Sequence, residues 1–184
     1  MVQCRCVIFI ACLLAILVQA GPASAAGAFQ QSALFRAGGY FPASKKFDVG
    51  TGFDLAYSVR PSPYAAVEAG IGYYRAESGT AAFLSALPLT LSARAILPLP
   101  YVNIHAGGGV GAYYKMAGGT TELPADHSEF SLGYHAGAGI EFPASNGLSL
   151  LLDAKYVFVN QGKFKSYDIK HDGAFLYGGF ALNF

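Results

Sequence analysis

Cysteine, charge and long apolar runs are all scarce in this sequence once its first segment is set aside. Cys4, Cys6 and Cys12 are the three cysteines, so the remainder has neither a disulfide framework nor a thiol nucleophile. Only 12% of the residues are charged, against roughly 25% in a typical soluble domain. Beyond the first segment, no apolar run reaches the ~20 residues that a membrane-spanning helix needs. If the chain enters a membrane, it must do so with alternating strands.

The first segment has the layout of a secretory signal peptide. Arg5 lies in a short n-region, an uninterrupted apolar run covers 7–18, and Ala23-Ser24-Ala25 supplies small residues for cleavage. The alternative is an uncleaved membrane anchor, but the run is too short to span a bilayer. We therefore expect a signal peptide at 1–26, Sec-type export, and one domain at 27–184.

The exported part carries no net charge, because removing Arg5 leaves eleven Lys and Arg against eleven Asp and Glu. A neutral chain lacks the basic surface that binds nucleic acid, so we expect no nucleic-acid partner. Its composition is instead apolar and aromatic, with 23 Gly, 12 Tyr and 14 Phe in the full sequence.

Apolar and polar or small residues alternate with period two through eight segments, as in strands with two different faces. The connections alternate between short turns that contain proline or Asn-Gly and longer polar loops. This pattern predicts an all-β fold, an eight-stranded antiparallel up-and-down transmembrane β-barrel that follows a cleaved signal peptide. The predicted strands are 32–41, 47–59, 64–75, 83–97, 101–115, 128–142, 148–161 and 173–184.

A soluble calycin-like barrel would show the same alternation with its apolar face inward. Three features favour an apolar outer face: that face is nearly free of charge, the other face is rich in glycine, and charged loops occur at one end only. On this assignment the second strand begins at Phe47, with that side chain outward. Pro88 indicates a bulge or the loop end of its strand. Five tyrosines near the ends of the outer faces are interpreted as interfacial belts, namely Tyr57, Tyr73, Tyr114, Tyr134 and Tyr156.

The inner face carries eight ionisable side chains in a lumen that is barely wide enough for side chains. Buried charges at this density must pair, which predicts a charge network that plugs the lumen. The alternative is a narrow polar path or gate. The predicted members are Arg36, Asp54, Glu68, Arg94, His105, His135, Asp153 and Lys155.

Only Asp126-His127-Ser128-Glu129 resembles a hydrolytic cluster, as in barrels that modify lipid A. Adjacent residues of a strand point to opposite faces, so His127 is badly placed to activate Ser128. The histidines lack acidic partners at metal-binding spacing, and the glycine-rich stretch at 107–111 is not a phosphate loop. We expect no catalytic residue, no metal and no cofactor.

The sequence resembles the small outer-membrane β-barrel family that includes OmpX, the OmpA transmembrane domain and the opacity-type proteins. The resemblance rests on the eight alternating strands, the segment 133–142 and the terminal Ala181-Leu182-Asn183-Phe184. It implies a bacterial outer-membrane location in contact with membrane lipids and lipopolysaccharide. It also implies that Phe180, Leu182 and Phe184 form an insertion signal for the barrel assembly machinery. We expect a non-enzymatic barrel with loops that interact at the surface; a small-solute pore or a lipid A-modifying enzyme are the alternatives.

Overall fold

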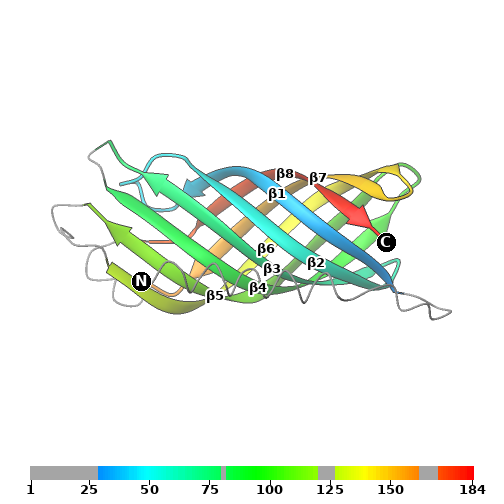
Figure 1. Ribbon diagram of the computed structural model, residues 1–184, viewed down its shortest axis with the longest axis horizontal. Coiled ribbons are helices and arrows are strands. Elements are labelled where there is room, and N and C mark those ends of the chain that lie inside the picture. The colour runs from blue at the N-terminus through cyan, green and yellow to red at the C-terminus, as the bar shows by residue number, and fades with distance from the viewer. Residues whose placement is uncertain (1–28, 80–81, 120–126, 162–169) are drawn as a thin grey trace.

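Eight antiparallel strands close into one barrel, each paired with its neighbour in the sequence and the last with the first (Figure 1). The computed structural model describes residues 29–79, 82–119, 127–161 and 170–184. The predicted all-β fold, an eight-stranded antiparallel up-and-down barrel, is confirmed, while the predicted signal peptide lies outside the described residues. The strands are β1 Gln30–Pro42, β2 Gly50–Ser62, β3 Ala65–Glu77, β4 Phe83–Pro98, β5 Asn103–Gly118, β6 His127–Ser145, β7 Leu148–Val159 and β8 Gly173–Asn183.

The strands lie oblique to the barrel axis, as Figure 1 shows, and their register gives the stagger. Following the row of paired residues from strand to strand around the barrel, starting at position 132 of β6, leads back to β6 at position 142, ten residues further along. Such a stagger accompanies the strand tilt that closing a sheet requires. The row faces outward and is wholly apolar: Leu132, Ala112, Leu89, Ile71, Leu55, Phe35, Phe180, Leu150 and Phe142.

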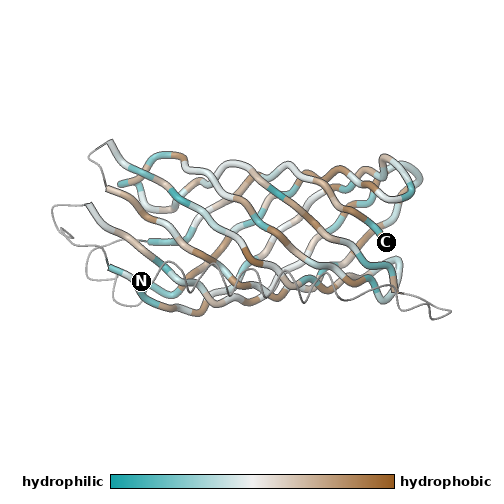
Figure 2. Tube along the Cα trace, in the orientation of Figure 1, coloured by the Kyte–Doolittle hydropathy of each residue, from teal (hydrophilic) through white to brown (hydrophobic). Residues whose placement is uncertain are grey.

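The outer wall is apolar, because exposed large apolar side chains alternate with buried residues along the strands. On β8, for example, Leu176 is 52% exposed whereas the neighbouring Phe175 and Tyr177 are 3% and 4% exposed. In Figure 2 brown segments recur along every strand between pale and teal ones. A wall of this kind matches the hydrocarbon of a membrane. Among the described residues, no helix is both long and apolar enough to cross a bilayer.

Two local predictions were wrong. Phe47 precedes β2 and is 7% exposed, because its amide bonds to Ser44 O in a turn that directs the ring into the core at the loop end. Pro88 causes no bulge and lies within β4: its pairs with β5 continue, and the register with β3 is the same on both sides of it. A proline removes one backbone donor without requiring an extra residue, so the register survives. The register shifts occur instead near the turns, at Val59/Ser62 and Pro143/Ser145.

Candidate functional site in the barrel lumen

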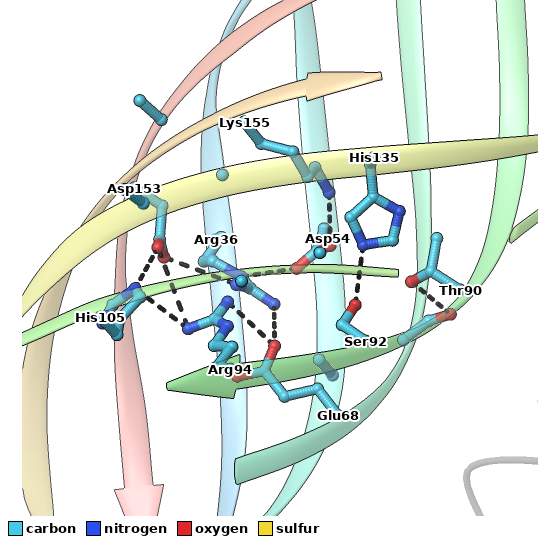
Figure 3. A pocket seen from close by; sticks show the side chains of 17 residues that line it. Arg36, Asp54, Glu68, Thr90, Ser92, Arg94, His105, His135, Asp153 and Lys155 are labelled. Atoms are coloured by element: carbon cyan, nitrogen blue, oxygen red, sulfur yellow. Dashed lines mark hydrogen bonds and ion pairs between the residues drawn. The ribbon is translucent and has the colours of Figure 1, made fainter. Parts of the chain in front are cut away.

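Charged and histidine side chains from seven strands gather near the middle of the lumen (Figure 3). Their positions share the inward phase of the strands, so the tilt and the closure of the sheet bring them together. Most are 4–6% exposed, while the Arg94 and Lys155 side chains are 14% and 19% exposed. The residues are Arg36, Asp54, Glu68, Arg94, His105, His135, Asp153 and Lys155, the eight that the sequence predicts for the inner face.

Arg36 is the centre of this cluster. Its Nε lies 2.7 Å from Asp54 Oδ1, its Nη2 lies 3.2 Å from Glu68 Oε2, and its Nη1 lies 3.5 Å from Asp153 Oδ2. One guanidinium therefore bridges β1 to β2, β3 and β7. Arginine suits this role because its planar fork presents several donors in fixed directions.

A second arginine makes similar bridges from the opposite wall. Arg94 Nη2 lies 2.9 Å from Glu68 Oε2, and its Nη1 lies 3.9 Å from Asp153 Oδ1. Asp153 Oδ1 also lies 2.6 Å from His105 Nε2. Asp153 thus joins β7 to β1, β4 and β5, which are strands that it does not pair with.

Lys155 completes the balance of charge, with its Nζ 3.4 Å from Asp54 Oδ2 and 5.3 Å from the centre of the Tyr177 ring. Three cations, on Arg36, Arg94 and Lys155, therefore meet three carboxylates. Every charge except that of Lys155 has two or more ion-pair partners, and such a balanced cluster is the arrangement that makes buried ions tolerable.

His135 stands apart from these ion pairs. Its Nε2 lies 2.8 Å from Ser92 Oγ, while its buried Nδ1 makes no hydrogen bond in the part of the chain that the structure describes. The sequence places His135 on the inner face but gives no sign of its different environment.

Glycines lie opposite the charged side chains and make room for them; the sequence predicts a glycine-rich inner face but not this pairing with the charges. Each of the seven charged or histidine residues outside β3 has a glycine directly across the ladder on a neighbouring strand: Arg36 with Gly179, Asp54 with Gly72, Arg94 with Gly107, His135 with Gly109, Lys155 with Gly137, and both His105 and Asp153 with Gly139. A Cβ at Gly139 would collide with Asp153 Oδ1 and lie 2.7 Å from His105 Nε2. The glycine-rich inner face is thus complementary to the charges, but only the register reveals the match.

An aromatic layer covers the cluster on its loop side. Tyr40, Tyr74 and Phe175 are at most 3% exposed, and the Tyr40 ring centre lies 4.5 Å from that of Tyr74 and 4.7 Å from that of Phe175. Tyr177 and Tyr113, 4% and 1% exposed, extend the layer across the lumen. These residues share the inward phase of their strands, whereas the predicted tyrosine belts concern only the outer face.

The loop end of the lumen is also filled. The backbone oxygen of His171 accepts hydrogen bonds from Tyr40 OH and Tyr74 OH, at 3.1 and 3.2 Å. Lys115 Nζ lies 2.6 Å from both Asn160 O and Glu129 Oε1. Burial lowers the pKa of His171, which lies outside the strands, to about 4. The residues that flank the β7–β8 connection therefore fold into the barrel mouth.

The turn end has its own polar layer. Arg60 of β2 pairs with Glu141 of β6 across the lumen, and Ser32 Oγ donates to Asn183 Oδ1 at 2.7 Å. Voids of about 40, 10 and 10 Å³ lie among these described residues. In the described ranges, no group of three or more His, Cys, Asp or Glu side chains could hold a metal ion.

The described residues of the possible hydrolytic cluster at 126–129 do not converge. Asp126 lies outside the described residues. Ser128 Oγ accepts a hydrogen bond from Tyr114 OH at 3.0 Å, on the outer face, while Glu129 pairs with Lys115 inside the barrel. His127 precedes Ser128 on the same strand, so the two side chains leave opposite faces.

Of the three residues predicted as an insertion signal, Phe180 and Leu182 lie on the outer face of β8, and Phe184 directly follows its last residue. Phe180, Leu182 and Phe184 are 39%, 49% and 61% exposed. Phe180 pairs with Phe35 of β1, with ring centres 5.5 Å apart, and the amide of Phe184 donates to Gln31 O at 3.0 Å. The last residue is thus held at the seam where the barrel closes.

Comparison with known proteins identifies a family for this chain and finds solved structures with the same fold. A family model described as an outer membrane protein beta-barrel domain matches residues 8–181. OprG from Pseudomonas aeruginosa is similar with a TM-score of 0.64 and 12% identity, over 85% of this chain and 96% of OprG. A major outer membrane protein from Thermus thermophilus is similar with a TM-score of 0.62 and 18% identity, over 85% of this chain and 100% of that protein. Neisserial surface protein A is similar with a TM-score of 0.59 and 14% identity, over 86% of this chain and 98% of that protein. No curated protein matches the sequence.

Proposed function

Because this chain belongs to the outer membrane protein beta-barrel domain family, we propose that it is a non-enzymatic barrel with a charge-plugged lumen and with loops for interaction at the cell surface. Its family places it in the bacterial outer membrane, where its wall contacts lipid. The proposal therefore concerns what the lumen and the loops do.

The cross-lumen ion pairs carry the proposal of a plug. Arg36 alone joins three carboxylates from three other strands, so the centre of the lumen is occupied by side chains that hold one another in place. The aromatic layer above and the Arg60–Glu141 pair below obstruct the same axis. The void of about 40 Å³ that the charge cluster lines has room for a few water molecules and no hydrated ion.

Conductance in planar bilayers tests the plug against a pore. Wild-type protein is expected to give no steady unit conductance, and neither is a Tyr114→Ala control, because Tyr114 is on the outer wall. Tyr177→Ala removes a ring that is 4% exposed in the lumen. Of the two substitutions, this one is expected to raise the leak current. Steady ion-selective channels from the wild-type protein would refute the plug and favour the pore.

The loop end is proposed to face outward from the cell. Its β1–β2 connection exposes Lys45 and Lys46, whereas the turns 98–102 and 143–147 at the opposite end contain no charged residue. Polar, charged loops suit contact with soluble or surface-bound partners. An amine-reactive reagent that cannot cross membranes should label these two lysines on intact cells. Labelling that requires lysis would reverse the proposed orientation.

We also propose Sec-type export with cleavage after residue 26, and insertion by the barrel assembly machinery through Phe180, Leu182 and Phe184. The outward, apolar character of these three side chains supports a role in recognition or membrane entry. The intact mass of the purified protein tests the cleavage, since it should correspond to a chain that begins at Gly27. A mass that includes the first 26 residues would contradict it.

A lipid A-modifying activity is the alternative from another functional class. The opposed directions of His127 and Ser128 count against it. Mass spectrometry of lipid A from cells that express wild-type or His127→Ala protein decides between them. Matching spectra support a non-enzymatic barrel, and a modification present only with the wild type would establish an enzyme.

A further inference from the structure

The outer wall of the barrel is hollowed across β3 to β6. An open groove of about 640 Å³ lies there, and its apolar lining residues are Ala69, Leu89, Leu91, Val110, Ala112 and Leu132. Thr90, Gly111 and Gly133 also line the groove although they form an inward-facing row, so the groove reaches down to the sheet itself. Ala112 marks its deepest part, because the small methyl group is paired with a leucine on each side, Leu89 and Leu132.

A ridge of large side chains on β6 lies directly beside this groove. Phe130 and Leu132 are 77% and 76% exposed, which makes them the two most exposed large apolar residues on the described strands. They protrude because the β6–β7 ladder begins only at Gly133 and Val159, where β7 ends. Leu132 is paired with Ala112, so the protruding side chain and the deepest part of the groove lie side by side at nearly the same level of the barrel.

This arrangement is self-complementary for two copies that are inserted in the same direction in one membrane. The two-fold axis between such copies is parallel to the barrel axes, so a residue of one copy meets residues at its own level in the other. The Leu132 side chain of one copy can therefore enter the groove at Ala112 of the second copy. By symmetry the reverse contact forms at the same time.

The ridge and the groove walls together expose enough surface for a specific dimer. Their six large apolar side chains are 53–77% exposed: Leu89, Leu91, Val110, Phe130, Leu132 and Tyr134. Covering them in both copies removes roughly 1,200 Å² of surface, above the about 1,000 Å² that a specific interface should exceed.

Close packing favours a second copy over lipid in this groove. Proteins associate in a membrane through tight packing, which small residues at the contact, such as Ala112 and Gly111, allow. A lipid chain also fits an apolar groove, but it loses conformational freedom when it is held there. The Leu132 side chain is already positioned by its strand, so it loses less.

We propose that the wall formed by β4, β5 and β6 binds a second copy of this chain, with Leu132 of each copy seated in the groove at Ala112 of the other. The interface lies on the lipid-facing side of the barrel. It is therefore independent of the charge plug and of whether the lumen conducts ions.

Cysteine cross-linking in outer-membrane fractions tests for this dimer in the lipid in which the protein resides. Cys4, Cys6 and Cys12 lie in the predicted signal peptide, and the wild-type protein is the blank for any background they give. After oxidation with copper phenanthroline, Leu132→Cys should give roughly ten times more dimer than Leu176→Cys, since Leu176 is 52% exposed on β8, at the far side of the barrel. Equal yields at the two positions would indicate random collisions and would overturn the proposal, as would no dimer at position 132.

A matched pair of variants tests the groove itself. Ala112→Leu fills its deepest part, whereas Ala154→Leu adds the same side chain to an exposed position of β7 outside the groove. Single-molecule photobleaching of dye-labelled protein in lipid bilayers counts the subunits, and an unchanged heat-modifiable shift shows that both variants fold. We expect two bleaching steps for wild type and Ala154→Leu, and one step for Ala112→Leu. Single steps for the wild type would mean that lipid fills the groove and would overturn the proposal; so would an Ala112→Leu protein that is dimeric like the wild type.

Discussion

Replacing Arg36 with methionine should destabilise the barrel more than any other single loss of charge. Met keeps much of the side-chain volume but leaves Asp54, Glu68 and Asp153 without their shared cation. The six-charge cluster then changes from formally neutral to −1. Breaking a buried ion pair by removing one partner typically costs 3–5 kcal/mol, and Arg36, 6% exposed, has three partners.

That loss corresponds to a roughly 100- to 4,000-fold smaller folding equilibrium constant, since about 1.4 kcal/mol is tenfold. Urea titration of the barrel refolded into lipid vesicles, followed by the heat-modifiable shift on gels, measures it. Arg75→Met is the control: its partner is Glu77, the side chains are 44% and 67% exposed, and the expected change is below about 1 kcal/mol.

A double variant separates loss of charge balance from loss of packing. Arg36→Met with Glu68→Gln restores a formally neutral cluster, so it should be more stable than Arg36→Met alone. A free energy of unfolding for Arg36→Met within about 0.5 kcal/mol of the wild-type value would contradict this prediction. So would a double variant in which Glu68→Gln lowers the free energy of unfolding by as much again.

Three other perturbations test the lumen, the mouth and the seam. Gly139→Ala places a methyl group 2.7 Å from His105 Nε2 and should lower the free energy of unfolding in urea by about 1–3 kcal/mol. Gly178→Ala is the control, because its added Cβ has no atom within 4 Å, and it should cost less than half as much. Equal losses would contradict the match between glycines and charges. Because burial lowers the pKa of His171 from 6.5 to about 4, the unfolded chain takes up the proton first, so stability should fall as the pH drops from about 6.5 to about 4. His171→Gln should flatten that part of the urea-midpoint profile, and an unchanged slope would count against it. Phe184→Asp puts a charge on a lipid-facing site 61% exposed and should reduce the heat-modifiable protein in outer-membrane fractions; wild-type levels would show that the terminal aromatic is dispensable.

The strands could be predicted because a wall between lipid and a narrow lumen imposes strict alternation on every residue. Two local predictions were nevertheless wrong, one just outside a strand and one within it. In the sequence, Phe47 continues the alternation of β2. In the structure it lies in a turn before the strand, and its ring is buried. Pro88 looks disruptive, yet a sheet tolerates one missing donor when the register needs no extra residue. Tyr113 and Tyr177 share the inward phase that the alternation predicts, but alternation alone does not show that they form a layer across the lumen.

The alternation along the chain predicts eight two-faced strands and puts eight ionisable residues on the inner face, although Arg60, Lys115, Glu129 and Glu141 also lie in the lumen. Alternation could not show the partners of any of these residues. Arg36 and Asp153 are 117 positions apart and lie on strands that do not pair, yet they meet because a ten-residue stagger tilts every strand across the lumen. The same stagger sets Gly139 opposite both Asp153 and His105 and leaves the three voids where it does. Periodicity is a local property of the chain, whereas contacts across a lumen depend on closure, which is a property of the whole sheet.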